Sequence, residues 1–103
     1  AIAINDGKQP GVDSYRQTAS VAFAAMAKAT TTAERRASFL KAVLALQSGN
    51  LVQEALYEGE RHLAPLAQDQ ESLMVMTRIA LAAGKPDKAQ HFIRRALGMS
   101  RPS

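Results

Sequence analysis

The residues whose types and spacing could do chemistry are Glu54, Glu58 and His62, which follow one another at intervals of four. On a helix this spacing places them on one face, where carboxylates and an imidazole could bind a metal or form a pH-sensitive pair. A metal site needs three or four ligands, and the sequence supplies no complete set at clear spacing and no cysteine. We therefore interpret these residues as a solvated polar stripe with ordinary helical contacts.

Short catalytic patterns occur, but their companion patterns are missing. Ser38 and Lys41 match the S-x-x-K pattern of serine acyl-enzymes, whose S-D-N and K-T-G patterns are absent. Gly84 and Lys85 lack the upstream glycine and the following Ser or Thr of a phosphate-binding loop. We expect no catalytic, cofactor-binding or metal-binding residues and no enzymatic activity.

Composition predicts the class of fold. The 103 residues make one domain or a piece of one, and 20 of them are alanine, with 5% aromatic residues and no cysteine or tryptophan. This profile excludes a disulfide-stapled mini-domain and a thiolate zinc site, and it disfavours a β-sandwich. The apolar runs are far shorter than the about 20 residues that cross a membrane. The sequence therefore predicts an all-α protein with no membrane insertion of this segment, because alanine is the best helix former.

Five helices are predicted, and capping residues bound the first two. Asp13 is expected to cap the first helix, which runs to about Ala29. Thr31 and Glu34 form a capping-box pattern, so the second helix is expected from there to about Ser48. The helical periodicity of these segments predicts which apolar side chains face inward. They are Tyr15, Ala19, Ala22, Met26, Ala29, Phe39, Leu40, Ala42, Val43, Leu44 and Leu46.

The third helix is expected between the break at Gly49-Asn50 and Pro65. Gly49 suits a left-handed C-cap, and Asn50 can cap the next helix with Gln53 at the reciprocal position. Pro65 should end or kink that helix. Gly59 in mid-helix costs about 1 kcal/mol relative to Ala, so it marks either a close helix contact or a tolerated weak spot.

Glycine and proline also bound the last two helices. Asp69 is expected to start the fourth helix, and Gly84 to end it. Pro86 suits the first turn of the fifth helix, which Gly98 is expected to close. The apolar residues expected inward from the last three helices are Ala55, Leu56, Leu63, Leu66, Leu73, Met76, Ala80, Ala83, Ala89, Phe92, Ile93, Ala96 and Leu97.

Gly49 and Gly84 lie 35 residues apart, and each is predicted between two helices. That spacing is typical of a helix–turn–helix array. The segment 81–97 resembles the tetratricopeptide repeat. That family has a turn glycine, a small residue five positions later, a bulky apolar residue four after that, then Ala-Leu and a proline near the repeat end. The matching residues are Gly84, Ala89, Ile93, Ala96, Leu97 and Pro102.

The resemblance implies a fold and a division of the chain. The implied fold is a fragment of a right-handed α-solenoid, in which antiparallel helix–turn–helix pairs stack to give about five helices. Residues 1–12 would be a lead-in or the remnant of a preceding helix, and residues 13–30 the helix of an incomplete preceding repeat. A degenerate repeat would span residues 31–68, where Ala55 follows the turn glycine at six positions instead of five. A second repeat would span residues 69–102.

The resemblance also implies a binding surface. In tetratricopeptide arrays the first helix of each repeat lines a concave groove, and this chain lacks the paired Lys and Asn positions that clamp a terminal carboxylate. A mostly apolar groove could receive a partner helix or an extended segment, or it could pack against neighbouring repeats. The positions that the alignment assigns to this candidate partner-binding groove are Leu40, Leu44, Gln47, Glu71, Met74, Arg78 and Leu81.

The expected function is a non-catalytic protein–protein interaction scaffold. Ala- and Gln-rich, cysteine-free, degenerate repeats are similar to those in periplasmic portions of bacterial outer-membrane exporters of exopolysaccharides, whose repeats recruit periplasmic polysaccharide-modifying enzymes. The similarity implies a periplasmic scaffold whose partners are such an enzyme and neighbouring repeats of the same chain. The alternatives are a small cytoplasmic chaperone that sequesters a partner helix and a basic regulatory or nucleic-acid-binding helical module.

The formal charge of +4 is unevenly distributed. Residues 1–50 carry +3, residues 51–75 carry −4 and residues 76–103 carry +5. Alternating charge could help successive repeats dock or steer an acidic partner. Nucleic acid is disfavoured as the partner, since no aromatic stacking platform accompanies the basic end.

Overall fold

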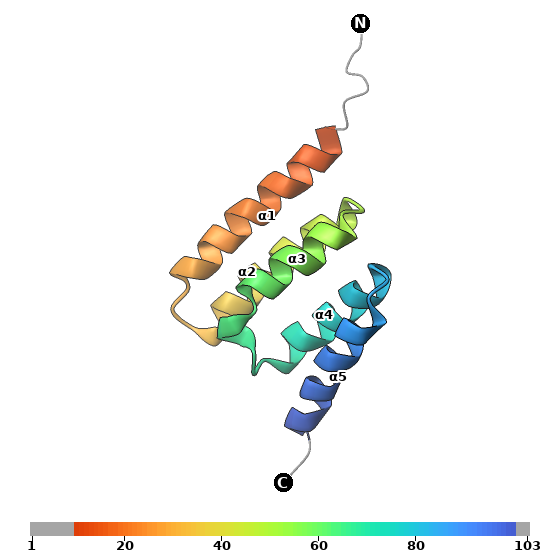
Figure 1. The fold of residues 1–103 in the computed structure, drawn as a ribbon. Coiled ribbons are helices and arrows are strands. Elements are labelled where there is room, and N and C mark those ends of the chain that lie inside the picture. Colours follow the sequence, from red (N-terminus) through yellow and green to blue (C-terminus); the bar gives the residue numbers. More distant parts are fainter. Residues whose placement is uncertain (1–9, 101–103) are drawn as a thin grey trace, which may run out of the picture.

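The computed structural model describes residues 10–100, with side chains described for 12–98, as helices joined by short connections (Figure 1). Within this range there is no strand, so the predicted all-α class with about five helices is confirmed. The predicted lead-in before Pro10 and the Pro102 of the repeat pattern lie outside the described residues. The elements are α1 (Pro10–Lys28), α2 (Thr32–Ser48), α3 (Val52–His62), the 3₁₀ turn η1 (Ala64–Leu66), α4 (Gln70–Ala82) and α5 (Pro86–Ser100).

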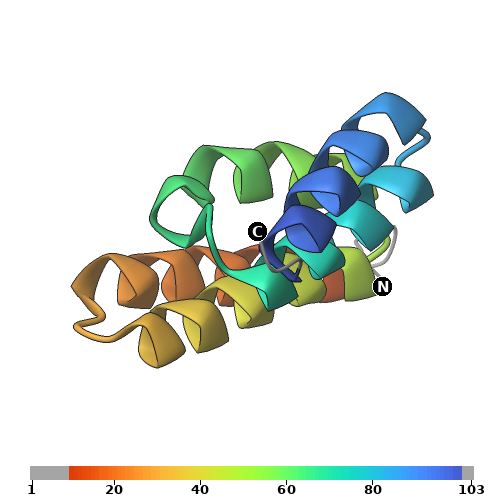
Figure 2. The ribbon, with the colours of Figure 1, turned by 90° about the horizontal axis from the view of Figure 1, so that it is seen from below.

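Helices that follow one another in the sequence pack against one another in space. α1 packs along α2 and α4 along α5, while α3 contacts both α2 and α4 (Figures 1 and 2). α2 also contacts α4 directly. The fold therefore brings together the two helices that carry the predicted groove residues.

Alanine occupies many of the buried positions between the helices. Short side chains let the helix backbones approach, so a few bulky residues, among them Phe39, Leu73 and Met76, suffice to fill the remaining core. None of the described helices is both long enough and sufficiently apolar to cross a membrane. The buried alanines among the predicted inward positions are Ala19, Ala22, Ala42, Ala55, Ala80, Ala83, Ala89 and Ala96.

Three apolar side chains that the periodicity placed inward are exposed instead: Tyr15, Leu44 and Leu97. The ring of Tyr15 lies over the backbone of Gly49 at the end of α2, at the margin of the core. Leu44 widens the apolar stripe of α2 beyond the part that the neighbouring helices cover. Leu97 lies on a side of α5 that no described helix covers, because α4 buries the side that carries Ala96.

Two predicted N-caps are confirmed. The Thr31 hydroxyl accepts a hydrogen bond from the Glu34 amide at 3.1 Å. The Glu34 carboxylate accepts from the Thr30 amide at 3.0 Å, which is one residue earlier than a capping box requires. The Asp69 carboxylate accepts from the Ser72 amide at 3.0 Å and caps α4. The side chains of Thr31 and Asp69 therefore cap the N-termini of α2 and α4, as the sequence predicted.

Other predicted helix ends differ. α1 begins at Pro10, within the expected lead-in, so Asp13 lies in its first turn and is not the cap. Pro is well suited to a first helical position because it has no amide hydrogen to satisfy there. Gly98 does not close α5, which continues to Ser100. The break before Pro65 is confirmed, since α3 ends at His62 and a 3₁₀ turn follows.

The turn between α2 and α3 is closed by Asn50 and not by Gly49. Asn50 has a left-handed φ of 62°, whereas Gly49 has a φ of −83°. The amides of Asn50 and Leu51 donate to the carbonyls of Gln47 and Leu46 at 2.9 and 2.8 Å, the paired hydrogen bonds of a left-handed C-cap. The prediction that Asn50 caps α3 is therefore wrong, because it terminates α2.

Gly84 makes the same turn between α4 and α5, with a φ of 75° and the same pair of backbone hydrogen bonds. The structural repeat therefore joins Asn50 to Gly84, which are 34 residues apart, and not Gly49 to Gly84. Ala55 and Ala89, both buried, then each follow their turn residue by five positions. In this alignment the repeat at residues 31–68 has the same five-residue offset as the repeat at residues 69–102, and the six-residue offset counted from Gly49 no longer applies.

Candidate functional site

The predicted groove residues occupy equivalent positions of α2 and α4. In the 34-residue alignment, each of those on α2 matches one on α4, and direct contact between the helices brings the two rows near each other. Gln47 is half-buried, whereas Glu71 and Arg78 are exposed. The matched pairs are Leu40 with Met74, Leu44 with Arg78, and Gln47 with Leu81.

Three large apolar side chains of this set are exposed. Leu44, Met74 and Leu81 are 40, 41 and 59% exposed. Leu40 is half-buried instead and packs against the core. A cavity of about 470 Å³ between α4 and α5 is lined by Leu81 but by no other residue of the set. The structure therefore places these residues on a mainly open surface of α2 and α4.

A partly buried ion pair joins α2 to the start of α4 beside this surface. Arg36 Nε and Nη2 each lie 2.8 Å from Asp69 Oδ1, and the Ser72 hydroxyl donates to Asp69 Oδ2 at 2.7 Å. Burial raises the pKa of Asp69, but the hydrogen bonds from Arg36 and Ser72 outweigh this effect and hold the pKa below its usual value. Asp69 is thus charged at neutral pH and fixes α2 relative to α4.

Polar side chains also connect α3 to the last two helices. Gln53 Nε2 donates to the Ala83 carbonyl at the end of α4 at 2.7 Å. Gln53 therefore does not complete a capping box at the start of its own helix. Lys88 Nζ lies 2.9 Å from Glu60 Oε2, which joins the basic α5 to the acidic α3. The ion pair between Lys88 and Glu60 therefore joins helices of successive pairs and uses charges from the basic and the acidic part of the chain.

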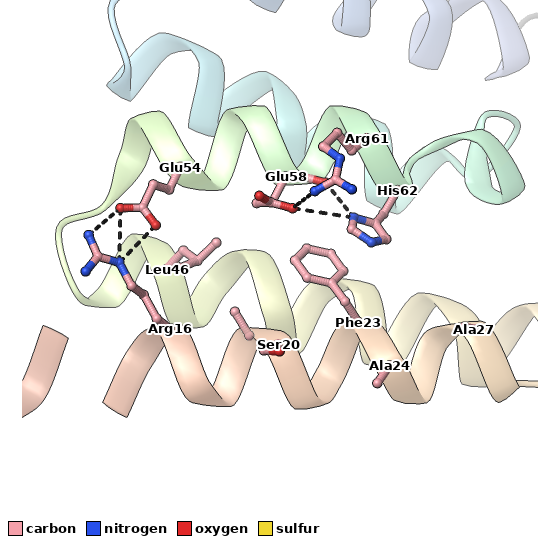
Figure 3. Close-up of a pocket in the computed structure, with 11 residues that line it drawn as sticks. Arg16, Ser20, Phe23, Ala24, Ala27, Leu46, Glu54, Glu58, Arg61 and His62 are labelled. Carbon is pink, nitrogen blue, oxygen red and sulfur yellow. Dashed lines mark hydrogen bonds and ion pairs between the residues drawn. The ribbon is translucent and has the colours of Figure 1, made fainter. Parts of the chain in front are cut away.

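A hollow of about 550 Å³ opens between α1 and α3 (Figure 3), and the sequence analysis did not predict it. Small residues of α1 leave room on one side, and polar residues of α3 form the other. The lining includes Arg16, Ser20 and Phe23 of α1, Leu46 of α2, and Glu54, Glu58, Arg61 and His62 of α3.

The carboxylates of the hollow are both paired with arginine. Arg16 Nε lies 3.0 and 3.2 Å from the two carboxylate oxygens of Glu54, and Arg16 Nη2 lies 2.6 Å from Oε2. This hydrogen bonding lowers the pKa of Glu54 and raises the pKa of Arg16. Glu58 pairs with Arg61 at 2.8 Å. Both carboxylates of the hollow are therefore engaged in ion pairs.

His62 closes one end of the hollow by stacking on Phe23 (Figure 3). The two ring centroids are 4.0 Å apart and the planes differ by 14°. His62 Nδ1 lies 2.9 Å from the backbone carbonyl oxygen of Glu58. The predicted stripe of Glu54, Glu58 and His62 is thus half-buried along the wall of an open hollow, where His62 and Glu58 make an ordinary i,i+4 contact.

The hollow presents apolar surface for packing and charged and polar groups for hydrogen bonding. Among the residues that the structure describes, no group of three His, Cys, Asp or Glu side chains could hold a metal ion. The stripe on α3 was visible in the sequence as an i,i+4 pattern. Its partners Arg16 and Phe23 had no such signature, because they lie on another helix 38 or 39 residues away from Glu54 and His62.

No protein-family model, curated protein or solved structure matches this chain.

Proposed function

We propose that this chain is a non-catalytic protein–protein interaction scaffold, part of a longer helical array of the tetratricopeptide type. The observation that carries the proposal is the exposure of Leu44, Met74 and Leu81 on two neighbouring helices. A single exposed apolar side chain is ordinary in a folded protein. Several on adjacent helices indicate a surface that another protein covers.

The repeat supports the array. Asn50 and Gly84 adopt the same turn at a spacing of 34 residues, which is the length of a tetratricopeptide repeat. Ala55 and Ala89 follow at the same offset, and both are buried. Two helix pairs and one additional helix are fewer than the about three repeats that a stable stack requires, which favours a role within a larger assembly.

The surface itself indicates the kind of partner. The exposed apolar residues flank the charged Arg78, a composition that suits the apolar side of a helix or an extended segment. We propose a periplasmic polysaccharide-modifying enzyme as the partner and the periplasm as the compartment. The support is the similarity of these Ala- and Gln-rich, cysteine-free repeats to those of bacterial exopolysaccharide exporters.

The test is a binding measurement with two matched surface variants. Leu44→Glu combined with Met74→Glu places charges on the proposed surface, whereas Tyr57→Glu places one on α3 at a residue that is 62% exposed. Titration calorimetry would use a purified periplasmic polysaccharide-modifying enzyme from the same organism. We expect the double variant to lose at least about tenfold in affinity and Tyr57→Glu to lose little. Circular dichroism checks that each variant is folded.

Equal affinity of the double variant and the unaltered chain would show that α2 and α4 are not the binding surface. If the unaltered chain did not bind that enzyme, the proposed partner would be wrong.

A further inference from the structure

A second, smaller hollow adjoins the one between α1 and α3. Its volume is about 290 Å³, and its lining shares Phe23, Ala27, Arg61 and His62 with the larger hollow. The stacked rings of Phe23 and His62 (Figure 3) therefore lie between the two hollows. α1 and α3 flank the smaller hollow, and both pack on α2, which also lines it. The smaller hollow is thus bounded by three consecutive helices of the described chain.

Much of the lining of the smaller hollow is apolar. Phe23 and Met26 are buried side chains of α1, and Ala27 and Pro65 complete the apolar lining. An engineered apolar cavity of about 150 Å³ binds a benzene molecule. A hollow of about 290 Å³ therefore has room for one aromatic ring or branched aliphatic group together with a few more atoms.

Every titratable side chain that lines the smaller hollow is basic. They are Arg35 of α2 and Arg61 and His62 of α3. The half-buried Arg35 donates from Nη2 to the Ala29 carbonyl at 3.1 Å, which fixes its guanidinium at the end of α1. Within the described part of the chain Arg35 makes no ion pair, and its other N–H groups make no hydrogen bond. Arg35 therefore has N–H donors to offer to a ligand.

The acidic side chains on the same helices have other partners. Glu58 of α3 pairs with Arg61 at 2.8 Å and does not line the smaller hollow. Glu34, which precedes Arg35 on α2, accepts hydrogen bonds from the amide and the hydroxyl of Thr30 at 3.0 and 3.2 Å. A half-buried charge beside apolar surface is costly without an opposite charge in contact. An anion in the hollow would supply that contact to Arg35.

We propose that the smaller hollow is a binding site for a small monocarboxylate with an aromatic or branched apolar body. The body would lie against Phe23 and Met26, and the carboxylate would accept from the free N–H groups of Arg35, with Arg61 beside it. The stacked rings bound the hollow on one side, so we infer a compact free acid as the ligand. The site shares no residue with the surface proposed on α2 and α4, so either can fail alone.

Phenylacetate is the probe, and phenylacetamide is its control, because the two have the same shape and only the first is charged. Two-dimensional ¹H–¹⁵N spectra of the full chain should show saturable shifts around Ala27 and His62, with a dissociation constant for phenylacetate of about 1 mM. Phenylacetamide should bind at least about tenfold more weakly. Raised ionic strength should weaken only the binding of phenylacetate. Equal binding of the two compounds, or no saturable shift at about 10 mM phenylacetate, would overturn the proposal.

Two arginine variants test the charge. Arg35→Gln should weaken binding of phenylacetate about tenfold or more. Arg95→Gln is the matched control, because Arg95 is also half-buried and donates to a backbone carbonyl, that of Ala67, but lies on α5. The control should bind phenylacetate as the unaltered chain does. Equal losses from the two variants would overturn the role of Arg35.

Two alanine variants test the hollow without removing the hydrogen bond of Arg35 to the end of α1. Ala27 and Ala25 are both exposed residues of α1, but only Ala27 lines the hollow. Ala27→Trp should fill the hollow and abolish binding, whereas Ala25→Trp should leave it intact. Circular dichroism checks that both variants are folded. Equal binding of phenylacetate by the two variants would refute the site.

A peptide that carries the same groups tests the source of the carboxylate. Acetyl-Ala-Ala-Phe with a free carboxyl terminus presents an aromatic ring and a carboxylate at the end of a chain. It should bind no more tightly than phenylacetate. Binding at least about tenfold tighter, and lost in Ala27→Trp, would mean that the carboxylate belongs to a protein terminus. That result would overturn the assignment to a free acid.

Discussion

Gly59 of α3 lies directly against Met76 of α4. A Cβ atom added to Gly59 would lie 2.6 Å from Met76 Sδ and 3.3 Å from Val43 Cγ1. Of the two interpretations that the sequence allowed for this glycine, the close helix contact is confirmed and the tolerated weak spot is wrong. The contact joins the two helix pairs. Because glycine has no side chain, α4 can pack closely against α3 at this point.

Gly59→Ala should therefore destabilise the protein, although alanine is the better helix former. The gain in helix propensity is about 1 kcal/mol, whereas overpacking a filled core costs about 1–3 kcal/mol. We expect a net loss of about 1 kcal/mol in the free energy of unfolding, measured by urea denaturation, since the thioether end of the fully buried Met76 would have to shift within the core.

Gly98→Ala is the matched control for that substitution. Gly98 also lies within a helix, but an added Cβ there meets nothing within 4 Å. This variant should gain a few tenths of a kcal/mol up to about 1 kcal/mol. If both alanine variants were stabilised equally, Gly59 would not be a constrained contact.

The left-handed turn at Asn50 gives a second prediction. A residue with a side chain pays about 1–2 kcal/mol in this conformation, and Asn pays less than most. Asn50→Ala should therefore lower the free energy of unfolding by about 1 kcal/mol, whereas Asn50→Gly should leave it unchanged or raise it. Thermal unfolding followed by circular dichroism would measure both. A harmless Asn50→Ala would contradict the assignment of the turn to this residue.

The same turn explains one limit of sequence analysis. Gly49 was the natural choice for the left-handed position, because glycine adopts it most readily. Asn50 takes it instead, and Tyr15 packs over the backbone of Gly49, a contact between segments far apart in the sequence. The one-residue shift made the repeat appear to be 35 residues long and Ala55 appear misplaced. Patterns within a helix predicted the fold class, but this tertiary contact, which leaves no room for a side chain at position 49, has no local signature in the sequence.

Asp69 makes stability depend on pH in a defined direction. Its pKa in the folded protein lies below the usual value of 3.8, so its contribution is present above that pH and is lost as pH falls through the folded-state pKa. Asp69→Asn should lower the free energy of unfolding by about 1 kcal/mol at neutral pH. The two proteins should converge in stability once the pH has fallen below the lowered pKa of Asp69 in the folded protein.

The control is Glu71→Gln, which removes an exposed carboxylate 3.8 Å from the same arginine, Arg36. An exposed pair at that distance contributes little, so this variant should remain close to the unaltered chain across the pH range. A constant stability difference between Asp69→Asn and the unaltered chain at every pH would contradict the role of the Asp69 charge.

The candidate site was predicted only in part, for a related reason. Leu44, Met74 and Leu81 could be nominated because repeat positions can be counted along the chain. Their exposure depends on which helix sides the fold covers. Arg16 and Phe23 had no local pattern that tied them to α3, and the fold alone brings them beside Glu54 and His62. Counting along the chain therefore identifies candidate positions, whereas contacts between helices determine how those positions are used.

The hydrogen bond between His62 Nδ1 and the Glu58 carbonyl predicts which tautomer the neutral imidazole adopts. A carbonyl oxygen can only accept, so Nδ1 must carry the proton and Nε2 must be bare. Two-dimensional ¹H–¹⁵N spectra of the neutral imidazole rings should show the Nδ1–H form for His62. His91 is exposed and is the internal reference for a ring in solvent.

Phe23→Ala removes the ring that stacks on His62 and should shift His62 toward a mixture of tautomers. An Nε2–H signal for His62 in the unaltered chain would mean that the imidazole does not donate to Glu58 and that the hollow is closed by a different arrangement.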